Sequence, residues 1–440
     1  MKNRELVNPP MLASVSPPKI HIERMLYRNS IAVTGDSTAS YALVKLIPAG
    51  GPARPLPLNV ALVLDVSGSM YEEDGTGRSR LSRVQDAAYS ALNMLKPEDH
   101  LAIIAFAYDC QVVLPSTSLQ ERDKIESVIG KIDRFQVDPG GTSMDAGIQM
   151  GLAEVEKHHG QGKLSQLVVL TDGETSNENA CRDLARQAGE KKIHFNLIGV
   201  GTEWNQSLIK DLAHLAEGRW GYIDANDPEA AQRVFQGHFE SLSSAAFLNV
   251  EMHIKSMKDI RVKRVRQVVP EIREMPLQDL EDRLQSAALG ALEKDKSPRY
   301  ILDLSLPRRP DGKFVIAQIE VRYDTSQGRE TTGSVPLEVT YSESAQGYVN
   351  AEVAKHIDEV QIYEQNKLLQ QAIAADNKSE VERLASQIAQ KGEVMGPRAV
   401  KKTMLARQVL QELHVGGRVS RKTQLAVDDL ARMAEETPSS

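Results

Sequence analysis

A continuous apolar run, Val60 to Leu64, ends at the carboxylate of Asp65 and is followed by Ser67 and Ser69. An uninterrupted run of this length predicts a strand that is buried on both faces, as is typical of parallel sheets. In an open α/β sheet, ligands bind in the crevice beyond the carboxyl ends of the strands. The stretch therefore predicts a buried strand that delivers one carboxylate and two hydroxyls to a binding edge.

Strand-like and helix-like patterns alternate after this opening strand. Apolar strands are predicted at 101–107, 167–170 and 193–200, and between them the apolar residues recur every three or four positions, as in amphipathic helices. A last helix is predicted at 228–239. The alternation predicts a doubly wound, Rossmann-like α/β domain over residues 56–240.

The period of the apolar residues changes to two after residue 245. Five alternating runs, with turns between them, predict an antiparallel β-sandwich over 245–345. Two earlier strand-like runs, within 18–50, have no sheet of their own, so we expect them to join this sandwich. The α/β domain would then be inserted in a β domain. Residues 1–17 are polar and proline-broken, and we expect a disordered lead-in there.

Residues 347–436 have a helical pattern to the end of the sequence. Asp376 with Asn377 interrupts it, and Gly416 with Gly417 interrupts it again. The pattern predicts a C-terminal helical segment made of two antiparallel helices and a looser tail.

The composition limits the partners and the compartment. The net charge is −7, which does not favour nucleic acid or an anionic membrane as a partner. No stretch approaches the roughly 20 apolar residues of a membrane span, and the N-terminus has no apolar signal-peptide core. The chain has only two cysteines, Cys110 and Cys181. We therefore expect a reduced, cytoplasmic protein.

Two further loops offer oxygen ligands at the same edge as Asp65. Thr142 lies in a GGT loop before a predicted helix, and Asp172 follows the strand LVVL in a TDGE loop. Loops at the carboxyl ends of a doubly wound sheet can converge near the switch point of the strand order. The resulting set of two carboxylates and three hydroxyls suits Mg²⁺, with Mn²⁺ or Ca²⁺ as alternatives. No His or Cys is near in sequence, which argues against zinc.

These residues resemble the metal-ion-dependent adhesion site of the von Willebrand factor A-domain family. The resemblance lies in D-x-S-x-S at Asp65, Ser67 and Ser69, in the separate Thr142, and in Asp172 of TDG. It implies that the hydroxyls bind the metal directly, and that the two aspartates bind it directly or through water. One coordination position would accept an Asp or Glu of a partner protein. The arrangement in a β-sandwich with a helical tail is similar to bacterial homologues of calcium-activated chloride channels.

The preferred interpretation is a non-enzymatic, Mg²⁺-dependent protein-interaction scaffold. A first alternative is an adaptor or substrate-recognition subunit of an AAA+ ATPase that docks through the C-terminal helices. A second is a metal-dependent hydrolase that uses Glu174 or Asp145 as a base, although Asp145 also fits an acid in the first turn of a helix. The plain structural alternative is that Asp65 and Asp172 cap helices and turns.

Overall fold

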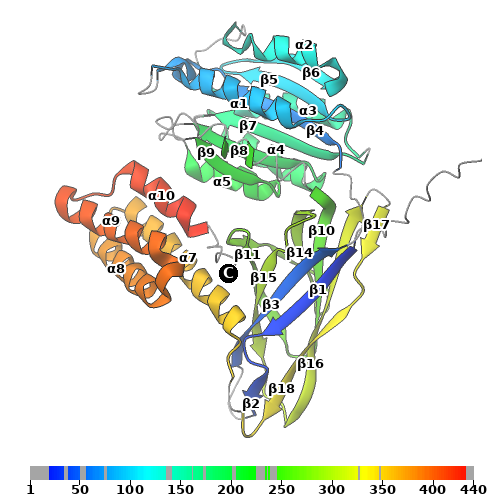
Figure 1. The fold of residues 1–440 in the computed structure, drawn as a ribbon, viewed down its shortest axis with the longest axis vertical. Helices are drawn as coiled ribbons and strands as arrows, with labels where there is room; N and C mark the ends of the chain where they lie inside the picture. The colour runs from blue at the N-terminus through cyan, green and yellow to red at the C-terminus, as the bar shows by residue number, and fades with distance from the viewer. Residues whose placement is uncertain are drawn as a thin grey trace, which may run out of the picture.

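The computed structural model contains an α/β domain, a β-sandwich and a group of C-terminal helices (Figure 1). The residues that it describes are 19–33, 38–49, 56–73, 77–134, 141–160, 162–171, 175–200, 205–223, 233–234, 236–237, 245–325, 328–345 and 348–432. The predicted lead-in at 1–17 lies outside them, and the predicted helix at 228–239 lies largely outside them. Figure 1 shows the α/β domain at one end of the sandwich and the helices beside both.

The α/β domain contains a six-stranded sheet in the order β6-β5-β4-β7-β8-β9, parallel except for the antiparallel edge strand β6. Its strands are β4 (Leu58–Asp65), β5 (His100–Phe106), β6 (Cys110–Ser118), β7 (Leu164–Thr171), β8 (His194–Val200) and β9 (Arg219–Ile223). Its helices are α1 (Arg80–Met94), α2 (Arg122–Ile129), α3 (Met144–Glu156), α4 (Glu178–Glu190) and α5 (Gln206–Leu215), with short 3₁₀ turns at Gly68–Tyr71, Leu119–Glu121 and Ile132–Arg134. Because β4 lies between β5 and β7, the strand order reverses beside it, and this is the switch point of the sheet. The predicted doubly wound α/β fold is confirmed.

The sheet is buried on both faces. Along β4, Val60, Leu62 and Leu64 face a core that is shared with α1 and α2. Ala61 and Val63 face the opposite core, which is shared with α3, α4 and α5. Since successive side chains of a strand point to opposite faces, burial on both sides explains why the run in the sequence is apolar throughout.

Three of the helices begin at polar caps beyond the carboxyl ends of the strands. The side chains of Ser79, Asn177 and Asn205 each accept a hydrogen bond from a backbone N–H of the first turn of α1, α4 and α5. Such a cap satisfies one of the donors that a helix start leaves unpaired. The local sequence thus directs the chain from strand to helix at the edge where the predicted site lies.

The β-sandwich contains two sheets that enclose a common core. The first sheet has the order β1-β3-β15-β11-β12 and contains β1 (Lys19–Leu26), β3 (Thr38–Ala49), β15 (Arg299–Leu306), β11 (Arg261–Val269) and β12 (Arg273–Met275). The second has the order β13-β14-β10-β16-β18-β2 and contains β13 (Leu277–Glu281), β14 (Leu284–Glu293), β10 (Ala245–Ser256), β16 (Gly312–Thr325), β18 (Val335–Ser342) and β2 (Ser30–Ala32), with β17 (Gly328–Thr331) paired to β16. β3 precedes the α/β domain and pairs with β15, which follows it. The α/β domain is therefore inserted in the sandwich.

The sandwich has more strands than the sequence pattern predicts. The five runs predicted after residue 245 correspond to β10, β11, β15, β16 and β18, while β12, β13, β14 and β17 are additional. β2 is an additional strand before the α/β domain. The pairing of β11 with β15 contains a register shift between Val262 and Arg264.

Four helices follow the sandwich, rather than a helical pair with a looser tail. They are α7 (Ala351–Ala374), α8 (Lys378–Met395), α9 (Val400–Gly416) and α10 (Arg421–Arg432), with a 3₁₀ turn at Gly396–Ala399. Gly417 adopts a left-handed conformation with φ of 70° that ends α9, a common end for a helix. The chain then continues into α10. Val427 of α10 lies in the core of the helices, whereas Leu425 lies in a core of the α/β domain.

The start of α7 packs on the outer face of the first sandwich sheet, where Val353, Ile357 and Val360 contact Leu43 and Ile301 among others. None of the described helices is both long enough and apolar enough to cross a membrane.

Candidate metal centre

The carboxylate of Asp65 is fully buried at the carboxyl end of β4. Its Oδ1 accepts a hydrogen bond of 2.9 Å from the backbone N–H of Ser67. A buried carboxylate is stable only when its oxygens are paired or bind a cation. The bond to Ser67 fixes the turn after the strand and orients the carboxylate towards the loop.

The second oxygen of Asp65 is held by the strand next to it. Thr171, the last residue of β7, donates a hydrogen bond of 2.8 Å from Oγ1 to Asp65 Oδ2. Thr171 is also fully buried. Thr171 is not among the site residues that the sequence predicts, although its position directly before Asp172 and after an apolar run is a usable signal.

The hydroxyls of Ser67 and Ser69 lie next to each other, with 3.1 Å between the two Oγ atoms. A 3₁₀ turn holds them there, because Met70 N donates to the carbonyl of Ser67 at 3.0 Å. Arg80 supports the turn from α1, since its guanidinium donates to the carbonyl of Ser69 at 3.2 Å. The D-x-S-x-S segment is thus a structured turn whose two side-chain oxygens converge.

The loop of Thr142 joins the same edge through its backbone. The N–H of the next residue, Ser143, donates to the carbonyl of Ala107 at 2.6 Å, and the Ser143 hydroxyl donates to the carbonyl of Tyr108 at 2.8 Å. Ser176, after β7, donates from its N–H to the carbonyl of Thr142 at 3.3 Å. Backbone contacts therefore link the loops after β5 and β7 to the start of α3.

Two of the predicted residues, Asp172 and Glu174, lie outside the described residues. Asp145, the other acid considered as a base, is described: it lies in the first turn of α3 and accepts a hydrogen bond of 3.1 Å from the amide of Asn177. Asn177 is the N-cap of α4. Asp145 thus joins the starts of two neighbouring helices.

The described donor set fits a hard divalent cation. Octahedral Mg²⁺ with oxygen ligands at about 2.0–2.1 Å places neighbouring ligands about 2.9 Å apart, close to the 3.1 Å between the two serine hydroxyls. Within the described residues, no group of three or more His, Cys, Asp or Glu side chains could hold a metal.

Comparison with known proteins agrees with this architecture. The family model of the von Willebrand factor type A domain matches residues 59–236. An uncharacterized protein from Synechocystis sp. is 28% identical over 333 residues, which are 74% of this chain and 76% of that protein. The human calcium-activated chloride channel regulator 4 is 26% identical over 200 residues, 45% of this chain and 20% of the regulator.

A solved structure, described as von Willebrand factor type A from Catenulispora acidiphila, is similar over 97% of this chain and 99% of its own. Its TM-score is 0.76 at 16% identity, so the likeness concerns the fold of all three parts. Domains of this type commonly mediate protein–protein interactions. The α/β unit of this chain, over residues 59–236, is a von Willebrand factor type A domain.

Proposed function

We propose that this chain is a Mg²⁺-dependent protein-interaction scaffold. Ser67, Ser69 and Thr142 would bind the metal through their hydroxyls, and Asp65 and Asp172 would bind it directly or through water. Mn²⁺ or Ca²⁺ are the alternative ions. The observation that carries the proposal is the pair of hydroxyls 3.1 Å apart beside the buried carboxylate of Asp65.

The charge of such a site explains what it would bind. A divalent ion held mostly by neutral hydroxyls keeps much of its positive charge, so an incoming carboxylate gains a strong interaction with it. Ser69 is only partly buried, which leaves the site open to the surface on the side of the turn. The partner in this proposal is therefore a protein that presents an Asp or Glu side chain.

The metal is tested first. Titration calorimetry with MgCl₂ should give saturable binding to the wild-type chain and none to Asp65→Asn or Ser69→Ala. Ser176→Ala, whose side chain is exposed beside the same edge, is the matched control and should bind as the wild type does. Equal Mg²⁺ affinity in all four proteins would remove the proposal.

The partner is tested next, by affinity purification of the chain from cell extract with Mg²⁺ and with EDTA. The specific partner should be lost with EDTA and with Asp65→Asn, and recovered when Mg²⁺ is restored. Substitution of single acidic residues on that partner should then identify one whose loss abolishes binding. Capture that ignores both EDTA and Asp65→Asn would contradict the role of the metal site.

A second function is favoured by the surface of the C-terminal helices, where several large apolar side chains are exposed. Met404 is 65% exposed and Val415 is 84% exposed, both on α9. Such side chains suit a docking face for another protein, as in an adaptor of an AAA+ ATPase. Met404→Glu with Val415→Glu should then abolish ATPase binding while Mg²⁺ binding stays unchanged.

We propose no enzymatic activity. A hydrolase that uses metal-bound water is the remaining alternative, and a phosphatase and esterase screen with Mg²⁺ or Mn²⁺ tests it. Turnover that is lost in Asp65→Asn would favour that alternative.

A further inference from the structure

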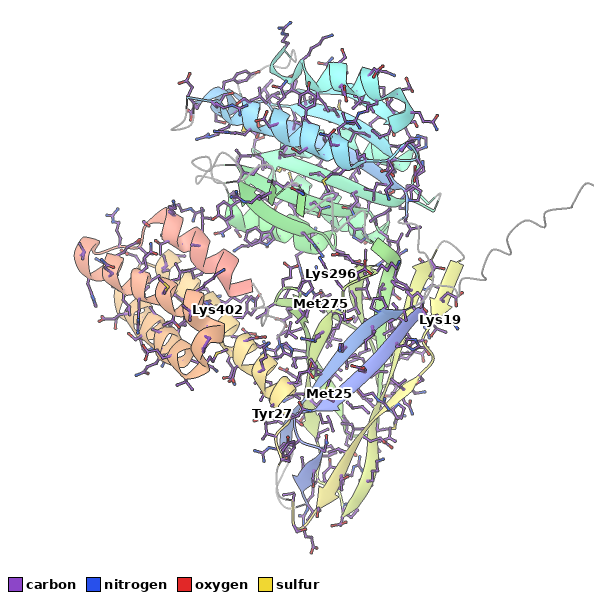
Figure 2. All side chains as sticks on the ribbon, viewed as in Figure 1. Lys19, Met25, Tyr27, Met275, Lys296 and Lys402 are labelled. Atoms are coloured by element: carbon purple, nitrogen blue, oxygen red, sulfur yellow. The ribbon has the colours of Figure 1, made fainter. Side chains whose placement is uncertain are left out.

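A cleft of about 910 Å³ lies where the three parts of the chain meet. Its walls come from α5 and β9 of the α/β domain, from β11, β12 and β14 of the sandwich, and from the middle of α7. Met275, one of its lining residues, lies at the end of the sandwich that faces the α/β domain (Figure 2). Small ligands often bind between domains, and the volume is at the upper end of the roughly 300–1,000 Å³ that is typical of their pockets.

The lining of the cleft is more positive than the chain as a whole. Seven of its residues are Lys or Arg and five are Asp or Glu, in a chain of net charge −7. Three of these acids, Asp211, Glu217 and Glu251, already have a cationic side chain within 3.2 Å. The cleft therefore favours an anionic ligand.

Two arginines of the lining, one from each domain, have only long polar contacts with the residues that the structure describes. Arg219, at the start of β9, lies 3.8 Å from Glu293, and its side chain is 34% exposed. Arg273, at the start of β12, lies 4.0 Å from Glu271 and donates to the side chain of Gln267 at 3.3 Å. A well-formed bond from a guanidinium to an anionic oxygen is about 2.7–2.9 Å long. Both arginines would therefore gain from a better acceptor in the cleft.

A buried hydroxyl lies near these two arginines. Arg273, Gln267 and Tyr300 are paired in a row across β12, β11 and β15. The Tyr300 side chain is fully buried, and its hydroxyl has no hydrogen-bond partner among the described residues. Burial raises the pKa of this hydroxyl, and the positive charges of Arg273 and Arg219 oppose the shift. A buried donor without a partner costs free energy, so an acceptor bound at this point would remove that cost.

This group of donors suits a phosphate. A guanidinium can donate two parallel N–H bonds to a phosphate or to a carboxylate. A phosphate monoester has three terminal oxygens that accept hydrogen bonds, whereas a carboxylate has two. Two arginines and a hydroxyl are therefore served more fully by a phosphate.

The rest of the cleft suits the organic part of such a ligand. The cleft is much larger than a phosphate group, and its lining includes the apolar side chains of Met275, Leu277 and Leu289. Trp220 of β9 also lines it, and the ring of a tryptophan favours contact with another flat group. A phosphate monoester with a flat apolar body would therefore fill the cleft better than inorganic phosphate.

From these observations we propose that the cleft binds a small phosphate monoester with a flat apolar body, whose phosphate lies between Arg219 and Arg273. The hydroxyl of Tyr300 donates to the same phosphate. Because β9 belongs to the α/β domain and β12 to the sandwich, the ligand joins the two domains. This inference is independent of the metal site, because the lining contains none of the residues assigned to that site.

The fluorescence of Trp220 measures the binding. The sequence contains two tryptophans, so Trp204→Phe leaves Trp220 as the reporter, and this variant is the parent for all comparisons. Phenyl phosphate is the probe, and it should change the fluorescence in a saturable way with a dissociation constant of about 1 mM or lower. No saturable change up to about 10 mM would overturn the proposal.

Three further ligands define the class. Inorganic phosphate should bind at least about 10-fold more weakly than phenyl phosphate, because it lacks the apolar ring. Benzoate has the same ring with a carboxylate and should also bind more weakly; equal affinity would show that the site does not select phosphate. A tyrosine-phosphorylated peptide that binds more tightly than phenyl phosphate would assign the cleft to a protein partner, and the small-molecule proposal would be wrong.

Matched variants identify the phosphate contacts. Arg219→Gln and Arg273→Gln should each lower the affinity for phenyl phosphate by about 10-fold or more. Arg219→Lys and Arg273→Lys keep the charge without the planar fork, so their affinities should be intermediate. Arg261→Gln, on β11 and outside the lining, is the control and should bind as the parent does. Affinity equal to that of the parent in both glutamine variants of the cleft would overturn the assignment.

Tyr300→Phe separates a contact with the ligand from a role in the fold. It removes a hydroxyl that has no partner among the described residues, so the free energy of unfolding of the free chain should not fall. The affinity for phenyl phosphate should fall several-fold, because the phosphate loses a donor. Lower stability with unchanged affinity would show that the hydroxyl serves the fold, and its assignment to the ligand would be wrong.

Amide exchange tests whether the ligand joins the two domains. Phenyl phosphate should slow exchange in both β9 and β12, and it should do so equally in Asp65→Asn, which separates this site from the metal site. Protection of only one of the two strands would overturn the joining of the domains. Protection that is lost in Asp65→Asn would contradict the independence of the two sites.

Discussion

The hydroxyl of Thr171 donates a 2.8 Å hydrogen bond to Oδ2 of Asp65, and both side chains are fully buried. The two residues end neighbouring parallel strands, since Leu64 and Leu170 are paired in the ladder of β4 and β7. Together with the N–H of Ser67 on Oδ1, this bond fixes the carboxylate in one orientation. The orientation of the Asp65 carboxylate is thus set by the two strands and by the turn that follows β4.

Thr171→Val tests this relationship. Valine has nearly the same shape as threonine but lacks the hydroxyl, so the hydrogen bond from Thr171 to Asp65 Oδ2 is lost. We expect the free energy of unfolding, measured in urea, to fall by about 1–3 kcal/mol. We expect the Mg²⁺ affinity to fall about 10–100-fold, as is typical when a residue that hydrogen-bonds a metal ligand is replaced. Thr171→Ser keeps the hydroxyl and should retain most of the metal affinity. Equal affinity in the valine and serine variants would contradict the role of the bond.

Cys181 should be an inert thiol. It is fully buried in α4, and burial, together with the negative charge of Asp145, raises the pKa of its thiol to about 12. The thiolate is the reactive form, so a thiol reagent at pH 8 should label Cys181 in the folded chain far more slowly than in urea. Cys110, which is partly exposed, is the internal comparison. Rapid labelling of Cys181 in the folded chain would contradict its burial.

Gly218 should tolerate no side chain. A Cβ atom there would lie 1.6 Å from the carbonyl oxygen of Phe195, a backbone atom of the neighbouring strand that cannot move aside. Extra atoms in a well-packed core cost about 1–3 kcal/mol of stability. Gly218→Ala should therefore lower the free energy of unfolding by more than that, or the variant should fail to fold. Gly416→Ala is the control, because nothing lies within 4 Å of its Cβ position and alanine favours a helix. Urea unfolding followed by circular dichroism measures the stability of both variants.

The elements that are buried on both faces could be predicted from the sequence, because their environment leaves an unambiguous pattern. The runs 60–64 of β4 and 167–170 of β7 are apolar for this reason, and a polar cluster that follows such a run indicates a site. Thr171 was missed because its role depends on which strands are neighbours and in what register. The sequence does not display pairing between residues 106 positions apart.

The missed elements are those whose structure depends on tertiary contacts. β14, with the sequence LQSAALGALE, is rich in Ala and Gly, which are depleted in strands, and it is held by pairing with β10. In the sequence, Gly416 with Gly417 predicts a break before a looser tail. The left-handed turn at Gly417 instead leads the chain into α10, whose Leu425 and Val427 are buried by two different parts of the molecule.

Arg266 should anchor α7 to the sandwich. Its side chain is 3% exposed, pairs with Asp303, and lies 3.2 Å from Glu364 of α7. Breaking a buried ion pair costs about 3–5 kcal/mol of stability. Because Arg264 also contacts Asp303 and Glu364, we expect Arg266→Met to lower the free energy of unfolding by about 3 kcal/mol, the lower end of that range. Amide exchange in α7 should rise in the same variant.

The matched control is on the same strand. Arg261 pairs with Asp279, but both side chains are well exposed, so Arg261→Met should change the stability by no more than about 1 kcal/mol. Equal effects of the two substitutions in urea unfolding would contradict a buried anchor at Arg266.

His194 should make the chain less stable in mild acid. Burial lowers the pKa of His194 below its usual value; Glu217 opposes this shift, and Lys192 and Arg273 add to it. Below about pH 6.5 the unfolded chain therefore binds a proton at this residue that the folded chain does not. The free energy of unfolding is then unaffected by His194 above that pH and falls as the pH drops below it, by at most about 1.4 kcal/mol per pH unit.

Urea unfolding between pH 7.5 and pH 5 measures this dependence in matched variants. His194→Gln should show a smaller loss of stability over the interval than the wild type, because the residue that takes up the proton in the unfolded chain is gone. His214→Gln, an exposed histidine of α5, should follow the wild-type curve. The comparison of slopes removes the contribution of the carboxylates, which all three proteins share. The same slope in His194→Gln and in the wild type would show that the buried imidazole does not govern the acid response.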